Sequence, residues 1–330
     1  MRPIPSVLLA LLVLGNISHA AEPVPQTEIT NGLVKLTIFL PDAKEGYYRG
    51  PRFDWSGMIA RAEYKGHMFY APWKTTHDPL NNEDAIGPCE EFGNEAPLGY
   101  KDAKIGETFV KIGVGQLEKA KNENYSFFYP YKIVKPGTWK TTPGKDQIEF
   151  VQELQSGNGW GYQYVKQITL PADSPTFVIS HRLKNTGTKP IETNHYNHNF
   201  TIIDNDPIGT NYRLKFPWAV TTKTKDAFRG VVVTEGNALI YKQNLQPGQS
   251  AYSELLGYSK KVEDNEVTVE NTKTGASVKI KGDMPLEKFN FWSVKLATCP
   301  EPFIDLKLMP EEKAMWKWEY TLTVRENDKR

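Results

Sequence analysis

Alternation of apolar and polar residues is the dominant pattern of this 330-residue chain from about residue 29 onward. In the clearest run, near the C-terminus, apolar residues occupy every second position: Trp316, Trp318, Tyr320, Leu322 and Val324. The same period of two governs residues 34–40, 110–114, 177–183 and 304–308. Because successive side chains of a β-strand point to opposite faces of a sheet, this period predicts half-buried strands.

Short turn signals separate the alternating runs, as at residues 156–159 (SGNG), 185–187 (NTG) and 246–248 (QPG). Many short strands joined by such turns are typical of an antiparallel sandwich or barrel. The best helical candidate, Gln116–Asn124, lacks the apolar stripe of a surface helix. Since no linker or fixed repeat follows the N-terminus, the sequence predicts an all-β fold: one large antiparallel domain over residues 21–330.

The N-terminal twenty residues have the pattern of a secretory signal peptide. Arg2 precedes an apolar run at residues 7–14 (VLLALLVL), and the segment ends on small residues at Ser18 and Ala20. This apolar run is too short to span a bilayer, and no later stretch is long enough. We therefore expect residues 1–20 to be removed and the protein to be exported, either to the periplasm or out of the cell.

Charge and composition restrict the partners that the chain can bind. The 40 Lys and Arg residues nearly balance the 39 Asp and Glu residues, giving a formal charge of +1. Such a balance argues against nucleic acid and against a polybasic membrane surface. Two cysteines, Cys89 and Cys299, are too few for a thiolate zinc site, so no metal or cofactor is expected. Aromatic residues make up 12% of the chain, and exposed aromatics commonly hold sugar rings.

Two segments in the first third of the chain carry charged residues among aromatics or glycines. Residues 47–57 (YYRGPRFDWSG) include Arg49 and Arg52, which suit hydrogen bonding to a polyhydroxylated ligand. An Arg–Asp pair at a sheet edge explains the same segment equally well. Residues 87–93 (GPCEEFG) read as a glycine-bounded acidic loop whose Glu90 and Glu91 are, on the simplest interpretation, solvated.

The densest polar run is Asn194–Phe200 (NHYNHNF). If it is a strand, His198 shares a face with Tyr196 and Phe200, while His195 points to the opposite face. The two histidines then cannot serve one metal site, so His198 is predicted as a proton-transfer group. His181, inside an alternating apolar run, is predicted as a core histidine.

A second candidate for proton transfer lies in residues 289–303, where Glu301 stands between Pro300 and Pro302. The two prolines favour a stiff, extended backbone that fixes the direction of the carboxylate. Glu301 is therefore a candidate general base, although a loop acid at the surface is the simpler interpretation of this segment alone.

The order of these segments resembles the galactose mutarotase-like superfamily, which includes aldose 1-epimerases and hexose-phosphate epimerases. Residues 198–200 (HNF) are similar to the family's histidine motif. Residues 299–302 (CPEP), followed by residues 308–312 (LMPEE), are similar to the glutamate segment and closing turn of the hexose-phosphate branch. The resemblance covers most of the residues after the signal peptide as a strand pattern.

The resemblance implies a large β-supersandwich with a carbohydrate cleft on one sheet face. By position, Glu301 would remove the anomeric hydroxyl proton and His198 would protonate the ring oxygen, while Arg52 and Trp292 would hold the sugar. Arg49, Glu91 and His195 are the remaining candidates for substrate binding. The segment at residues 89–93 lacks the second His or the Arg that aldose epimerases carry in a glycine-rich loop, and no aspartate matches the one that holds the sugar.

Three functions follow as hypotheses. The first is an exported carbohydrate-active enzyme similar to aldose 1-epimerases, acting on a mono- or oligosaccharide. The second is a polysaccharide lyase or glycoside hydrolase on the same fold, with Glu90, Glu91, Trp55, Trp160 and Tyr162 along a longer groove. The third is a carbohydrate-binding protein without turnover. Export argues against a sugar phosphate as the substrate, because sugar phosphates are largely cytoplasmic.

Overall fold

A computed structural model describes residues 24–121 and 124–325. The predicted signal peptide, residues 1–20, lies outside these described residues. Within them, the chain forms 23 strands in four antiparallel sheets, and the one helical element is a short 3-10 turn at Val262–Asp264. The predicted all-β class is confirmed.

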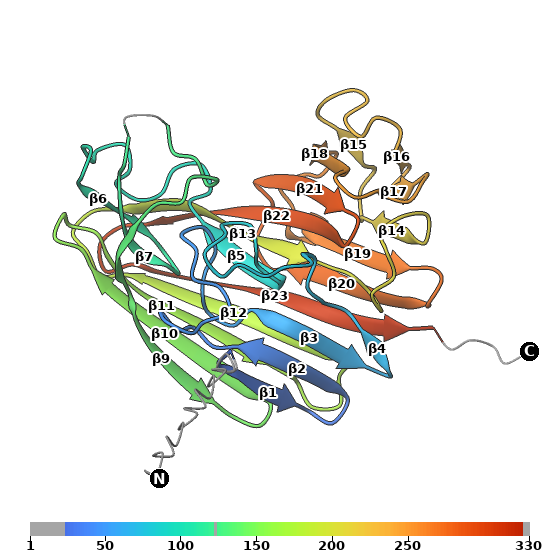
Figure 1. Ribbon diagram of the computed structural model, residues 1–330, viewed down its shortest axis with the longest axis horizontal. Helices are drawn as coiled ribbons and strands as arrows, with labels where there is room; N and C mark the ends of the chain where they lie inside the picture. Colours follow the sequence, from blue (N-terminus) through green and yellow to red (C-terminus); the bar gives the residue numbers. More distant parts are fainter. Residues whose placement is uncertain (1–23, 122–123, 326–330) are drawn as a thin grey trace, which may run out of the picture.

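The largest sheet has ten strands, and Figure 1 shows it running the length of the molecule. In spatial order these are β16 (Val232–Glu235), β17 (Ala238–Tyr241), β14 (Tyr212–Lys215), β19 (Glu266–Asn271), β20 (Ala276–Gly282), β23 (Lys313–Val324), β12 (Thr176–Asn185), β11 (Gly161–Thr169), β10 (Gln147–Gln155) and β9 (Thr138–Pro143).

A six-stranded sheet lies over the middle of the ten-stranded one (Figure 1). Its strands, in spatial order, are β15 (Thr221–Thr222), β18 (Ser250–Leu256), β21 (Lys288–Val294), β22 (Ala297–Leu308), β13 (Ile191–Phe200) and β5 (Gly87–Phe92). Two smaller sheets complete the fold: β1 (Gln26–Thr30), β2 (Val34–Phe39), β3 (Ile59–Tyr64) and β4 (His67–Met68) in one, and β6 (Thr108–Lys111), β7 (Gly115–Glu118) and β8 (Ile133–Pro136) in the other.

The two large sheets pack face to face through the alternating side chains that the sequence predicts. On β23, Trp316, Trp318, Tyr320 and Leu322 are buried. The Tyr320 hydroxyl accepts a hydrogen bond from Asn197 Nδ2 at 2.7 Å and donates one to Asn199 Oδ1 at 2.9 Å, joining β23 to β13 across the core. Burial of one face of each sheet supplies the main stabilisation of a sandwich, about 25 cal/mol for each Å² of apolar surface removed from water.

The missing apolar stripe of Gln116–Asn124 agrees with the structure, in which residues 115–118 form β7 and Leu117 is buried. One expectation of secondary structure is wrong. Residues 87–92 are not a solvated loop but the strand β5, which is buried along its whole length. The two acidic side chains suggest a solvated loop, but a carboxylate that is paired with a cation can be buried as completely as a leucine.

The structure also shows the state of the two cysteines and bears on the question of membrane spans. Cys89 and Cys299 are both buried, and neither takes part in a disulfide. Across residues 24–121 and 124–325, we find no helix with the length and apolar character needed to cross a bilayer.

Candidate functional site

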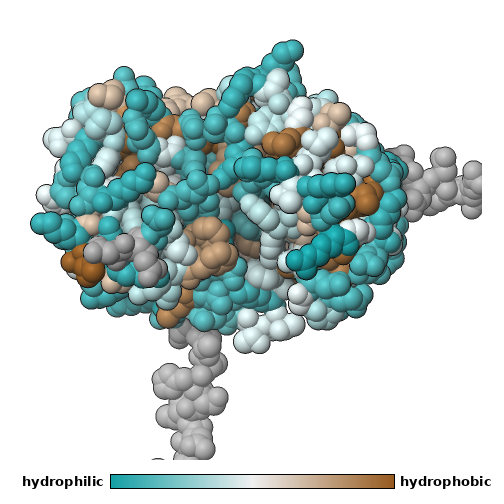
Figure 2. Space-filling view, turned by 90° about the horizontal axis from the view of Figure 1, so that it is seen from above, coloured by the Kyte–Doolittle hydropathy of each residue, from teal (hydrophilic) through white to brown (hydrophobic). Residues whose placement is uncertain are grey.

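A cavity of about 490 Å³ opens on the outer face of the six-stranded sheet. Figure 2, which views the molecule from above, shows the surface hollowed near its middle, with hydrophobic side chains inside the hollow. The floor consists of alternate residues from four neighbouring strands, which places them on one sheet face: Tyr196, His198 and Phe200 on β13; Glu301 and Phe303 on β22; Lys288, Asn290 and Trp292 on β21; Ser250 and Tyr252 on β18. Strand register therefore fixes the floor of the site.

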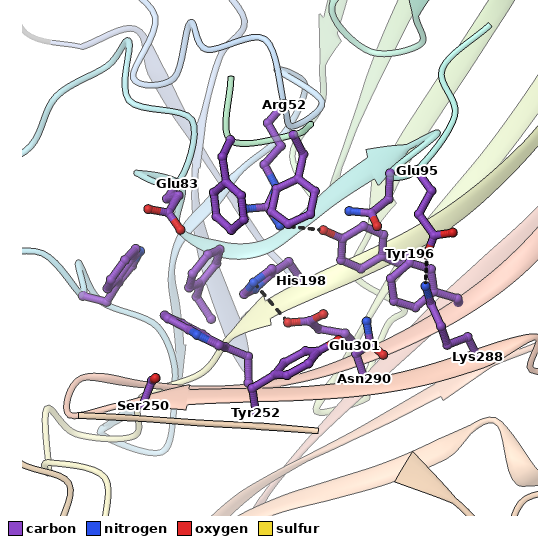
Figure 3. A pocket seen from close by; sticks show the side chains of 17 residues that line it. Arg52, Glu83, Glu95, Tyr196, His198, Ser250, Tyr252, Lys288, Asn290 and Glu301 are labelled. Atoms are coloured by element: carbon purple, nitrogen blue, oxygen red, sulfur yellow. Dashed lines mark hydrogen bonds and ion pairs between the residues drawn. The ribbon is translucent and has the colours of Figure 1, made fainter. Parts of the chain in front are cut away.

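His198 and Glu301 meet at the bottom of this cavity. Their side chains come from the adjacent strands β13 and β22, and His198 Nε2 lies 3.1 Å from Glu301 Oε1 (Figure 3). Only 5% of His198 and 6% of Glu301 is exposed. Glu301 is directed by its strand, because Pro300 and Pro302 hold the backbone extended and point to the opposite face. The structure thus brings together the two candidates for proton transfer.

Burial shifts both members of this pair toward their neutral forms. Loss of solvation raises the pKa of the Glu301 carboxyl to about 8, against the opposing positive charge of Arg52. Loss of solvation also lowers the pKa of His198 well below its ordinary value, and Arg52 lowers it further. At neutral pH the pair therefore holds one proton, which the raised pKa of Glu301 and the lowered pKa of His198 place on the carboxyl.

Arg52 lines the cavity and is fixed by a buried network behind it. Its Nε donates to Glu91 Oε2 at 2.9 Å, and its Nη2 donates to the Tyr196 hydroxyl at 3.0 Å. The Tyr196 hydroxyl in turn donates to Glu91 Oε2 at 2.5 Å, and Lys111 Nζ donates to Glu91 Oε1 at 2.6 Å. Burial raises the pKa of Glu91, but Lys111 and Arg52 outweigh this effect and hold the pKa below its ordinary value. Because a guanidinium carries five N–H donors, Arg52 retains donors for a ligand in the cavity.

Aromatic side chains form much of the cavity wall. Trp73 packs edge-on against Trp292, with ring centroids 5.4 Å apart, and stacks on Phe200 at 5.6 Å. The Arg52 guanidinium lies over the Phe127 ring, 4.1 Å from its centroid. Aromatic faces and convergent polar groups in one concave site suit the apolar faces and hydroxyl edges of a sugar.

Four sequence-predicted residues, His198, Glu301, Arg52 and Trp292, line this cavity. The other three do not. Arg49 donates through Nη1 to the backbone oxygen of Lys44 outside the cavity. The Glu91 carboxylate lies beneath the floor, where it accepts hydrogen bonds from Arg52, Lys111 and Tyr196. His195 is on the core face of β13, as its alternation with His198 requires, and is wholly buried. The assignment of these three residues to substrate binding is therefore corrected.

Residues that the lyase or hydrolase hypothesis placed along a groove also lie elsewhere. Trp55 is buried and donates through Nε1 to the Gly50 backbone oxygen at 2.9 Å. Trp160 borders a separate surface hollow, together with Asp102, Glu107 and Lys189. Tyr162 is buried and donates to Gln152 Oε1 at 2.7 Å. The aromatic lining of the cavity also includes Trp73, Phe127, Phe128 and Tyr252, which the sequence does not single out.

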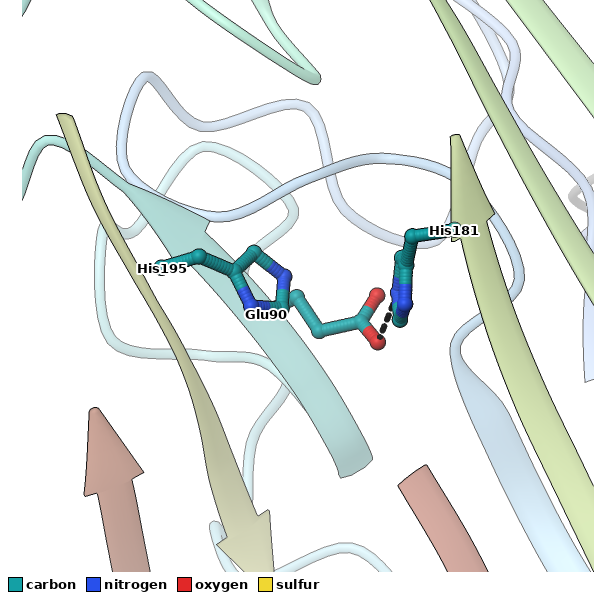
Figure 4. A group of neighbouring side chains, drawn as sticks. All are labelled: Glu90, His181 and His195. Carbon is teal, nitrogen blue, oxygen red and sulfur yellow. Dashed lines mark hydrogen bonds and ion pairs between the residues drawn. The ribbon is translucent and has the colours of Figure 1, made fainter. Parts of the chain in front are cut away.

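The core face of β5 contains a second polar cluster, formed by Glu90, His181 and His195 (Figure 4). Their ligand atoms lie within 4.8 Å of one another, near enough for one metal ion to contact all three. However, Glu90 Oε2 already contacts the ammonium of Lys166, and its Oε1 lies 2.8 Å from His181 Nε2. Metal-binding histidines usually anchor their second ring nitrogen, but within the described residues His181 Nδ1 and both nitrogens of His195 have no hydrogen-bond partner.

The cluster therefore fits a buried ion pair better than a metal site. Burial raises the pKa of Glu90, but Lys166 and His181 outweigh it and hold that pKa far below its ordinary value. Burial lowers the pKa of Lys166, and the charges of Glu90 and Asp54 more than reverse this effect. Since Lys166 is on β11 and Glu90 on β5, this pair connects the two large sheets inside the core. The prediction of His181 as a core histidine agrees with this position.

Comparisons with solved structures identify the fold. The chain superposes on a galactose mutarotase-like protein from Lactobacillus casei with a TM-score of 0.54 at 12% identity, covering 90% of this chain and 100% of that one. A galactose mutarotase-like protein from Clostridium acetobutylicum gives 0.54 at 13% identity, with coverage of 92% and 99%. An aldose epimerase homologue from C. elegans gives 0.51 at 12% identity, with coverage of 92% and 100%.

At these identities the likeness establishes the fold. The chain has the galactose mutarotase-like fold, and the resemblance that the sequence indicated is confirmed at that level. No protein-family model matches the sequence, and no curated protein matches it significantly.

Proposed function

We propose that this protein is an exported enzyme similar to aldose 1-epimerases, which interconverts the anomers of a sugar by acid–base catalysis. The observation that carries the proposal is the direct contact of His198 Nε2 with Glu301 Oε1, at 3.1 Å, on the floor of an aromatic cavity. An acid and a base within hydrogen-bonding reach of one another suit a reaction that moves one proton off a substrate and another onto it.

The proton count of the pair matches this reaction. In the proposed mechanism, Glu301 takes the proton of the anomeric hydroxyl while His198 donates a proton to the ring oxygen. The bond between C1 and the ring oxygen breaks, the open-chain aldehyde rotates about C1–C2, and the reverse transfers close the ring as the other anomer. The reactive form, ionised Glu301 with protonated His198, differs from the neutral pair only by transfer of the carboxyl proton from Oε1 to Nε2, which lie 3.1 Å apart.

The surroundings of the pair supply binding and orientation. Arg52 offers its remaining N–H donors to sugar hydroxyls, and Asn290 pairs with Glu301 across β21 and β22, where its side chain donates a hydrogen bond that favours the carboxylate. Trp292 and Trp73 offer apolar surface to the sugar ring. Because these groups are fixed on a sheet or by a buried network, little reorganisation is needed during the reaction.

Polarimetry tests the proposal directly. Purified protein should accelerate the mutarotation of at least one common hexose or pentose above the buffer rate, and Glu301→Gln should abolish the acceleration. If the wild-type protein accelerates none of these sugars, the epimerase function is wrong. Calorimetric binding without turnover would then support a carbohydrate-binding protein, and new ultraviolet absorbance from a glycan would support a lyase.

Export is part of the same proposal and rests on residues 1–20 alone. Expression of the full chain in a Gram-negative host should yield a periplasmic protein whose N-terminus is Ala21. Recovery of the uncleaved chain in the cytoplasm would contradict export without affecting the proposed chemistry.

A further inference from the structure

The cavity extends well beyond the catalytic pair. His198 and Glu301 are almost completely buried at its floor, whereas Phe128 and Tyr252, which line the same cavity, are 62% and 54% exposed. A volume of about 490 Å³ lies within the range of pockets that enclose ligands of more than one ring. We propose that Phe128 and Tyr252 form a second sugar subsite and that the enzyme acts on neutral oligosaccharides through their reducing end. This inference rests on the proposed function.

One wall of this subsite comes from the chain between β7 and β8. Phe127 packs against the Arg52 guanidinium, and the Phe127 and Phe128 rings lie 4.1 Å apart. The pair is therefore anchored to the buried Arg52–Glu91 network through Phe127, while Phe128 presents its ring to solvent. A large aromatic ring that is held in place yet exposed is unfavourable in water and favourable against a sugar face.

The other side of this subsite is the outer end of the floor, on β18. Figure 3 shows Tyr252 on the far side of the His198–Glu301 pair from Arg52. Tyr252 is paired in register with Trp292 on β21, so its ring continues the aromatic surface of the floor outward. Two exposed aromatic rings thus border the cavity, Phe128 beside Phe127 and Tyr252 beside Trp292.

The depth of the catalytic pair decides which end of a glycan enters. Anomer exchange requires a free C1 hydroxyl, and the groups that act on it are buried at the floor. A sugar bound with C1 at the floor directs its other end toward the exposed aromatics, so a further unit attached there would contact Phe128 and Tyr252. In this orientation a glycan enters the cavity with its reducing end first. Its next sugar unit then contacts the apolar rings of Phe128 and Tyr252.

Charge at the rim favours an uncharged chain. Lys288 is neutralised by Glu95, its Nζ lying 2.6 Å from Glu95 Oε1, and Glu83 adds a further carboxylate to the cavity lining. The other cation of the described lining, Arg52, shares the single carboxylate of Glu91 with Lys111, so this group keeps one positive charge that offsets the charge of Glu83. The charges around the cavity therefore balance, and they provide no net attraction for an ionised glycan.

The test compares sugars that share a reducing glucose. Mutarotation of cellobiose, maltose and lactose should proceed with a higher kcat/KM than that of glucose for at least one linkage. Phe128→Ala combined with Tyr252→Ala should lower the ratio of the disaccharide to the glucose kcat/KM by about three- to tenfold, the loss expected for stacking on aromatic rings. Met315→Ala, which removes an equally exposed apolar side chain outside the cavity, should leave this ratio unchanged.

Measurement of sugar affinity provides a second test that does not depend on turnover. In the Glu301→Gln background, calorimetry should show tighter binding of the same disaccharide than of glucose, and the double substitution should remove the difference. Equal affinity for both sugars together with an unchanged kcat/KM ratio would overturn the subsite while leaving the epimerase function intact. Preferential disaccharide binding without mutarotation by the wild type would instead overturn the epimerase function and retain the subsite.

Discussion

His195 and His198, three residues apart on β13, face opposite sides of the six-stranded sheet. His198 contacts Glu301 in the open cavity, whereas His195 lies in the core beside Trp316, with ring centroids 5.1 Å apart. The sheet therefore separates two polar centres that are nearly adjacent in sequence. One centre is accessible to substrate, and the other contributes to the contact between the two sheets.

Replacing either member of the cavity pair should remove catalysis. Glu301→Gln and His198→Asn should each lower kcat by about 10²–10⁴-fold, the usual contribution of a positioned acid or base. Because the two groups act as one unit, the double variant should be little worse than either single variant. Polarimetric rates check the effect, and circular dichroism checks that the fold is retained. Fully additive losses would contradict a shared proton pathway.

The pH dependence of kcat/KM should reflect the single proton of the pair. Activity should fall about tenfold per pH unit above the Glu301 pKa of about 8, because the pair then has no proton to donate to the ring oxygen. On the acid side, the lowered pKa of His198 delays uptake of a second proton, so activity should stay level to below pH 6.5. A maximum confined to the acidic range, near the ordinary glutamate value of 4.5, would contradict the raised Glu301 pKa.

The raised pKa of Glu301 also predicts that replacing this residue stabilises the protein at alkaline pH but not at acidic pH. Between 4.5, the ordinary pKa of glutamate, and about 8, the folded protein holds a proton on Glu301 that the unfolded chain has released. The free energy of unfolding therefore falls as the pH rises through this window. Glu301→Gln removes this loss and should stabilise the protein by about 2–5 kcal/mol near pH 9. The gain should disappear near pH 4, which urea titrations at both pH values would establish.

The buried ion pair in the core should be far more sensitive than an exposed one. Lys166→Met leaves the Glu90 charge without its cation inside the sandwich, so we expect a loss of about 3–5 kcal/mol in the free energy of unfolding. The matched control is Lys184→Met, which breaks an exposed pair with Glu311, whose atoms lie 2.7 Å apart. That loss should stay below about 1 kcal/mol. Similar effects of both substitutions in denaturant titrations would contradict the structural role of Lys166.

The parts of the site that follow from strand period could be predicted from the sequence. Alternation along residues 194–200 separates His198 from His195, and the prolines beside Glu301 indicate its extended backbone. Both assignments depend only on local geometry. The resemblance to the mutarotase-like superfamily then places the two residues in one site, which no local pattern can do.

The acids of β5 show why the rest could not be predicted. Glu90 and Glu91 resemble solvated loop residues until their cations are known, and these come from β11 and from β6, as Lys166 and Lys111. Such pairs depend on the packing of sheets and carry no sequence period. The residues of the cavity wall could not be predicted for a related reason. Trp73 and Phe127 lie on irregular segments, and tertiary contacts determine the paths of these segments.

The origin of the floor and of the walls has a consequence for how the site can change. The proton-transfer pair and its neighbours project from paired strands, whereas Trp73, Glu83, Phe127 and Phe128 belong to connecting segments. Connecting segments tolerate substitution and insertion much better than the strands that they join. New sugar preferences can therefore arise by exchanging these segments, and the chemistry that acts on the anomeric carbon is inherited unchanged.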